Sequence, residues 1–164
     1  MQGRSLFWII VGVFAVSAVA VSVFSWSVIG GIESRARATD ARLREVAWGV
    51  LAYADEFAAF PLAESEFRAF LARPEGVPAA IAADPAGAYP ATRADAGLAT
   101  DAPPLGAQFD ACLTELEIEW PLARDVQPIV RTRGLATLQG TLPAVGDWLW
   151  AMATRVRESG AGEG

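Results

Sequence analysis

The first part of the chain is an unbroken apolar run. Leu6–Ile29 spans 24 residues and contains no charged residue and no proline. Because about 20 apolar residues are enough to cross the hydrocarbon core of a bilayer as a helix, this run predicts a transmembrane anchor, with a short tail, over residues 1–31. Trp8 and Trp26 bracket the run. At about 1.5 Å per residue they are roughly 27 Å apart along a helix, which places one indole at each membrane interface.

Two other structures share this pattern. A cleaved signal peptide has an apolar region of about 7–15 residues, which is much shorter than the run observed. A core helix of a soluble protein is apolar on one stripe rather than on every face. The length of the run and its uniform apolarity therefore favour an uncleaved anchor over both.

A second helical pattern follows over about residues 32–61, and its apolar positions recur every three or four residues. This spacing predicts an amphipathic helix that continues from the anchor. The face expected to pack comprises Leu43, Val46, Val50, Leu51, Tyr53, Phe57, Phe60 and Pro61. A stripe of this kind requires a partner, which is either the chain's own head or a neighbouring subunit. Phe60-Pro61 is expected to end the helix, because a residue before proline avoids helical geometry.

The remaining pattern predicts a small head over residues 62–158. We expect a short helix at Glu64–Ala72 and a Pro/Ala/Gly-rich loop over residues 74–106 that is partly disordered. Strand candidates follow at 116–120, 129–133 and 135–138, and residues 112–116 suit either a helical turn or the start of a strand. Thr141, with Pro143 in the first turn, marks the start of a final helix, and residues 159–164 are expected to be a flexible tail. The predicted fold class is α+β, with short helices and a few antiparallel strands in the head.

Composition narrows the possible chemistry. The formal net charge is −6, there is no histidine, and Cys112 is the only cysteine. An acidic chain repels phosphate backbones, so nucleic acid is not an expected partner, and no run of basic residues attracts anionic lipid. Glu115, Glu117 and Glu119 would share one face of a strand, which favours a solvated surface over a cation site. No motif points to catalysis, a metal or a cofactor, although a pair of carboxylates brought together by folding stays open.

The junction of the two helical patterns resembles a known family. Type II secretion pseudopilins and type IV pilin-like proteins carry a membrane-spanning helix that runs into an amphipathic helix, which often ends in Tyr, four residues, Gly, any residue, Tyr, Pro. This chain has Tyr53-Ala54-Asp55-Glu56-Phe57-Ala58-Ala59-Phe60-Pro61, with the same spacing from Tyr to Pro. Ala58 and Phe60 replace the Gly and the second Tyr. At the amino end, Trp8 stands where the family has a glutamate. The resemblance implies a pilin-like anchor and stalk that carry a divergent head.

These observations lead to three functional hypotheses. The first is a non-enzymatic single-pass membrane protein that makes protein–protein contacts, as a pseudopilin-like subunit of a secretion or pilus-type assembly. The second is an accessory subunit of a larger membrane complex, whose transmembrane helix packs through small residues. The third is a membrane-tethered hydrolase or binding protein with a carboxylate–Trp cleft.

The expected partners are the lipid bilayer and other membrane or assembly proteins, including further copies of this chain. The resemblance implies a bacterial inner-membrane protein with an exported carboxy-terminal domain. The excess of arginine after Ile29 points to the opposite orientation by the positive-inside rule.

Overall fold

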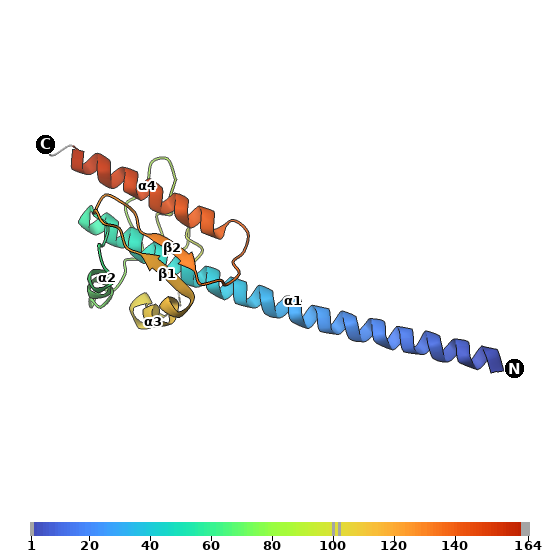
Figure 1. Cartoon of the computed structure of the whole chain (residues 1–164). Helices are drawn as coiled ribbons and strands as arrows, with labels where there is room; N and C mark the ends of the chain where they lie inside the picture. Colours follow the sequence, from blue (N-terminus) through green and yellow to red (C-terminus); the bar gives the residue numbers. More distant parts are fainter. Residues whose placement is uncertain (1, 100, 102, 162–164) are drawn as a thin grey trace. The chain divides into compact units, whose positions relative to one another are not determined.

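A computed structural model describes the backbone of residues 2–99, 101 and 103–161, and the side chains of these residues apart from 2–7, 9, 10 and 27. The chain divides into two compact units, Met1–Arg35 and Ala36–Gly164. The described elements are α1 (Gln2–Phe57), α2 (Glu64–Leu71), α3 (Leu105–Glu115), β1 (Leu116–Glu119), β2 (Ile129–Thr132) and α4 (Thr141–Ala161) (Figure 1). We call the second unit the head. The predicted α+β class is confirmed.

Helix α1 contains the apolar run and continues through Gly30-Gly31 without a break. Among the described residues it supplies the one helical stretch that is long and apolar enough to cross a membrane. None of the most apolar window of this stretch is buried within the protein. A core helix of a soluble protein would be covered, so this part of α1 is not a core helix of the chain's own fold.

The part of α1 that belongs to the head is its central core helix. Figure 1 shows this part lying between α4 on one side and α2 and α3 on the other, with the sheet in front. Residues 46–54 are all buried. A helix that is covered from several directions has no face toward solvent. The sequence predicted one buried face, but this part of α1 is buried on every side. The predicted stalk, residues 32–61, lies mostly within the head.

Two glycines allow short helices to approach closely. A Cβ atom on Gly49 of α1 would lie 2.6 Å from Leu105 Cδ2 and 3.0 Å from Phe67 Cζ. A Cβ atom on Gly106 would lie 2.7 Å from the carbonyl oxygen of Leu71, at the end of α2. Both approaches are closer than a side chain permits, so Gly49 positions α2 and α3 against α1, and Gly106 lets α3 begin beside the end of α2.

The sheet is a single antiparallel hairpin. Leu116 pairs with Thr132, and Ile118 pairs with Val130. Leu116, Ile118 and Val130 join the core, whereas Glu117 and Glu119 are exposed, which is the alternation expected of a half-buried sheet.

Two local predictions for the head were wrong. Glu115 is the last residue of α3 and forms an ion pair with Arg42, so it does not share a strand face with Glu117 and Glu119. Of the two structures expected for residues 112–116, the helical turn is the one found up to Glu115, and Leu116 begins β1. Residues 135–138 form no strand. The ladder ends where Gly134 turns the chain at a positive φ, and the backbone N–H of Leu138 bonds to Asp40 instead of to a strand.

The long loop between α2 and α3 is ordered in its described part. It ends at Pro104, two residues earlier than predicted, because α3 begins at Leu105. The indole N–H of Trp48 donates to the carbonyl of Pro78 over 3.0 Å, and Ile81, Tyr89 and Leu98 join the core. Helix α4 extends to Ala161, so the predicted tail overlaps it, and residues 162–164 lie outside the described residues.

Candidate functional site

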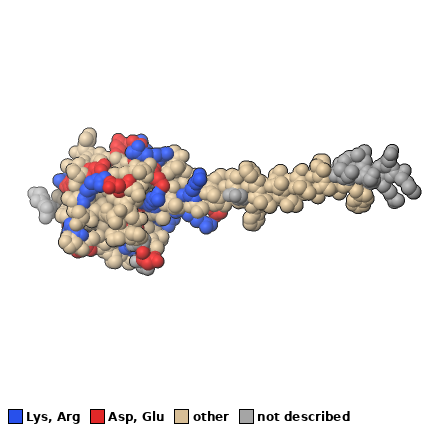
Figure 2. Space-filling model, turned by 90° about the horizontal axis from the view of Figure 1, so that it is seen from below, with Lys and Arg blue, Asp and Glu red and all other residues tan. Residues whose placement is uncertain are grey.

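The exposed apolar segment of α1 is the first functional feature. Every described side chain from Trp8 to Arg35 is exposed, including Trp8 at 68% and Trp26 at 82%. Figure 2 shows no charged atoms over the described part of the apolar run, while charges of both signs cover the head. Such a surface is stable only in an apolar environment, because the hydrophobic effect disfavours its contact with water.

The predicted packing face of the stalk is used inside the head. Leu43, Val46, Val50, Leu51, Tyr53, Phe60 and Pro61 are buried, whereas Phe57 is about half exposed. Tyr53, Phe57 and Phe70 form an aromatic cluster with ring centroids 4.6–6.1 Å apart. The buried members of this face contact the chain's own core, and Phe57 is its one member with a large exposed surface.

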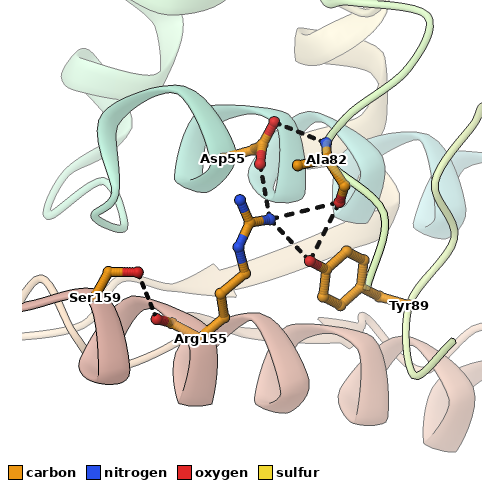
Figure 3. Close-up of polar contacts among 5 residues, drawn as sticks. All are labelled: Asp55, Ala82, Tyr89, Arg155 and Ser159. Carbon is orange, nitrogen blue, oxygen red and sulfur yellow. Dashed lines mark hydrogen bonds and ion pairs between the residues drawn. The ribbon is translucent and has the colours of Figure 1, made fainter. Parts of the chain in front are cut away.

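A polar network joins three separate segments at one end of the head (Figure 3). Arg155 of α4 lies 2.8 Å from Asp55 Oδ1 of α1 and donates to the hydroxyl of Tyr89 over 2.8 Å. The contact with Asp55 Oδ1 is an ion pair that lacks the alignment of a hydrogen bond. Asp55 Oδ2 accepts the backbone N–H of Ala82. Burial alone would lower the pKa of Arg155, but Tyr89 and Asp55 raise it above its ordinary value, so this cation is held charged.

A second network surrounds the carboxylate of Glu66. It accepts hydrogen bonds from the Tyr53 hydroxyl at 2.6 Å, from the Leu62 backbone N–H at 2.9 Å and from Arg124 at 2.8 Å. These donors, Tyr53 first, lower the pKa of Glu66 to about 2. Burial and the contact with Glu66 raise the pKa of Tyr53. Glu66 is therefore a fixed anion that ties the hairpin turn to the end of α1, and it is unsuited to proton transfer near neutral pH.

Two polar residues of α1, Asp40 and Glu45, are buried and have long-range partners. Asp40 accepts the Leu138 backbone N–H at 3.1 Å and the Thr141 hydroxyl at 2.8 Å, which fixes the start of α4. Glu45 forms a bidentate pair with Arg93 of the long loop, at 2.8 and 2.9 Å. Sequence reasoning did not identify these residues, because their partners are 48 to 101 positions away and no local pattern connects them.

The surface of the head contains shallow hollows. One of about 380 Å³ is lined by Asp84, Tyr89, Asp95 and Trp148, the residue types expected of a carboxylate–Trp cleft. Both carboxylates close local turns, since Asp84 accepts the Ala88 N–H and Asp95 accepts the N–H and hydroxyl of Thr92. The hollow therefore holds two structural carboxylates rather than an acid–base pair in a closed site.

Few of the described residues are suited to nucleophilic catalysis or metal binding. Cys112 is buried, and burial raises the pKa of its thiol, which keeps it protonated and unreactive. No group of three or more potential metal-ligating side chains occurs among the residues described.

An exposed apolar tip lies where the hairpin meets the end of α1. It comprises Phe57, Leu62, Leu122 and Val126, and Leu122 is fully exposed. The Phe60 N–H donates to the Arg124 carbonyl over 2.7 Å, so the hairpin turn is held beside the end of α1. No local pattern predicts this tip, because Leu122 and Val126 lie in a turn between two prolines where apolar residues do not recur at a regular spacing.

Comparisons with protein-family models, with curated proteins and with solved structures found no match to the chain. The candidate site consequently rests on the geometry described above.

Proposed function

We propose that this chain is a non-enzymatic single-pass membrane protein whose head makes protein–protein contacts, as a divergent pseudopilin-like subunit of a secretion or pilus-type assembly. The observation that carries the proposal is the contrast within α1. Its apolar run has only exposed described side chains, whereas residues 46–54 of the same helix are all buried in the core of the head.

The bilayer is the environment that suits the apolar run. A charge-free stretch of this length buries its side chains in lipid and satisfies its backbone groups within the helix, which lipid requires. A signal sequence near the amino end meets the same length and composition criteria, and the experiments below separate the two.

The head is suited to contacts rather than to catalysis. Its strongest polar groups, including Glu66, Arg155 and the Glu45–Arg93 pair, are satisfied by partners within the head. Its apolar tip leaves four large apolar side chains exposed. Exposed apolar groups with polar surroundings are typical of protein interaction sites.

The pseudopilin-like part of the proposal is supported by the resemblance around Tyr53–Pro61 and by the use of one helix for both anchor and core. Burial within the head limits which residues of α1 are available for self-association. Val46, Val50 and Leu51 are buried by the head, so contacts between copies would use the apolar tip or the lipid-facing part of α1.

The anchor is tested by fractionation of cells that express the full chain. We expect the chain to stay in membranes after alkaline carbonate extraction and to keep its full mass of 17.3 kDa. A shortened product released into the soluble fraction would show that the apolar run is a cleaved signal sequence. Protease accessibility in intact cells assigns the side of the membrane, and we expect the exported side.

The contact surface is tested by site-specific photocrosslinking in native membranes. A photoreactive residue at Leu122, in the apolar tip, should give discrete protein adducts. Ala86, which is exposed on the long loop, provides a matched control. Equal adduct yields at the two positions would remove the tip from the proposal.

The alternative of an accessory subunit is favoured by one observation on α1. Gly12, Ala15 and Ala18 are exposed small residues at steps of three, and a Cβ atom on Gly12 would meet nothing within 4 Å. Small residues at this spacing allow transmembrane helices to approach closely. Replacing Gly12 with Leu should reduce co-purification with membrane partners if this alternative holds, and should leave adducts formed at Leu122 unchanged.

A further inference from the structure

A loop at the amino end of the head carries apolar side chains in an unusual place. Residues 133–140 connect β2 to α4, and we call them the basal loop. Leu135 and Leu138 in this loop are 41% and 39% exposed. The two leucines are three residues apart and give this loop a pair of exposed apolar side chains.

Contacts with α1 fix the basal loop at the point where α1 enters the head. Asp40 accepts the Leu138 N–H at 3.1 Å and the Thr141 hydroxyl at 2.8 Å. Asp40 is itself buried. The loop is therefore held to α1 by a carboxylate that also fixes the start of α4, and it is not a free connection.

The chain between the apolar run and this contact is short. Uncharged residues continue to Ile32, and Glu33 is the first charged residue after the run. Asp40 follows Ile32 by eight residues, so the chain can separate the two residues by no more than about 29 Å in any conformation. Leu6–Ile32 would be about 40 Å long as a helix, which matches a bilayer with its headgroup layers. Ala36 is already buried, so the head covers α1 within four residues of Ile32.

Charge complementarity identifies the surface that the basal loop meets. Arg131 lies two residues before the loop and Arg133 is its first residue; both are exposed, and Arg133 Nε donates to the Leu116 carbonyl at 3.1 Å. Arg131 has one distant partner, Glu119 at 3.5 Å. Exposed leucines flanked by arginines are suited to a lipid headgroup layer, where the apolar groups enter the interface and the cations meet phosphates. The sequence contains no run of basic residues, but Arg131 and Arg133 directly precede the two leucines.

We propose that the basal loop rests on the headgroup layer of the membrane that anchors α1, with Leu135 and Leu138 inserted between headgroups and Arg131 and Arg133 facing lipid phosphates. This inference rests on the proposed membrane anchor and adds a second, peripheral contact that limits how far the head moves from the bilayer.

The test compares single fluorophores at the two ends of the head. Leu135→Cys, Leu138→Cys and Leu122→Cys are labelled in the full chain with a small environment-sensitive probe. Cys112 is buried, so the unsubstituted chain measures background labelling. The proteins are reconstituted in phosphatidylcholine–phosphatidylglycerol vesicles containing a lipid with a nitroxide on its headgroup. Leu122 is the matched control, because it is fully exposed and lies beside the carboxy end of α1.

We expect the nitroxide to quench probes at Leu135 and Leu138 about twofold or more strongly than a probe at Leu122. Quenching at Leu138 should weaken in vesicles of phosphatidylcholine alone, because the arginines then lose their anionic partners. Weak quenching at both loop positions, or equal quenching at Leu122, would overturn the inference. Flotation of the vesicles separates the two failures: a chain that does not float refutes the anchor and this contact together, whereas a floating chain with unquenched loop probes refutes the contact alone.

Discussion

Gly49 provides a sharp test of how the head is packed. In an exposed helix interior, replacing glycine with alanine stabilises a protein by about 1 kcal/mol, because the unfolded chain loses freedom. At Gly49 the added Cβ would lie 2.6 Å from Leu105 Cδ2 and 3.0 Å from Phe67 Cζ. Both neighbouring side chains are buried, so neither can move into solvent.

The expected magnitude follows from these opposing effects. Overpacking a filled core costs about 1–3 kcal/mol, and the helical gain offsets about 1 kcal/mol of this. We therefore expect Gly49→Ala to lower the free energy of unfolding by up to about 2 kcal/mol. Gly146 in α4 is the matched control, since a Cβ atom there would meet nothing within 4 Å. Gly146→Ala should raise the free energy of unfolding by about 0.5–1 kcal/mol.

The assay is urea unfolding of the full chain in detergent micelles, followed by near-ultraviolet circular dichroism. The micelle-embedded part of α1 is common to all variants, so its contribution cancels in the difference. Leu105→Ala should be less damaging in the Gly49→Ala background than alone, because it removes the nearer of the two colliding side chains. Stabilisation by Gly49→Ala equal to that by Gly146→Ala would refute the proposed packing of α1 against α2 and α3.

Three further predictions concern the buried polar contacts and use the same unfolding assay. Glu66→Gln should lower stability by about 1–2 kcal/mol at pH 7, a range reduced for the partial exposure of this side chain. The pKa of Glu66 is lowered to about 2, so its carboxylate stabilises the head above the ordinary carboxyl pKa range, and this stabilisation is lost as pH falls toward 2. The difference in free energy of unfolding between wild type and Glu66→Gln should therefore shrink below about pH 4. A difference that does not change with pH would contradict the network. Asp40→Ala should cost about 2–3 kcal/mol and Asp40→Asn less, since two donors lose a charged acceptor; equal stability of the three proteins would show that Asp40 does not hold α4. Arg93→Met should cost about 3 kcal/mol by leaving Glu45 charged and buried, and adding Glu45→Leu should recover most of this loss; a neutral Arg93→Met would show that the pair is not needed.

Local signals in the sequence were sufficient to predict where some helices begin or end. Thr141 with Pro143 predicted the first residue of α4, because helix starts favour these residue types. Pro61 placed the end of α1 within a few residues. Helix α3 was missed although its buried residues, Leu105, Phe109 and Cys112, recur at helical spacing. The prolines before Leu105 extended the apparent loop, but they mark the start of this helix.

Long-range contacts explain what the sequence did not reveal. The loop between α2 and α3 has the composition of a disordered segment, yet it is held by the Glu45–Arg93 pair and by the Trp48–Pro78 hydrogen bond. The stripe on α1 predicted one buried face, whereas the head covers Trp48 and Ala52 on the others. A short chain segment records its own period but not the number of neighbours that pack around it.

The polar residues of α1 show how one helix supports two environments. Within the head, Asp40 holds the start of α4, Arg42 holds the end of α3, and Glu45 and Asp55 hold the long loop. Together these contacts join three segments to α1, so these residues specify how the segments are arranged around a core that hydrophobicity alone would leave poorly ordered. The apolar run has no such groups and depends on its surroundings for burial. This division uses the polar groups of α1 for structure, so the features left for function are surfaces: the exposed apolar part of α1, the basal loop and the apolar tip.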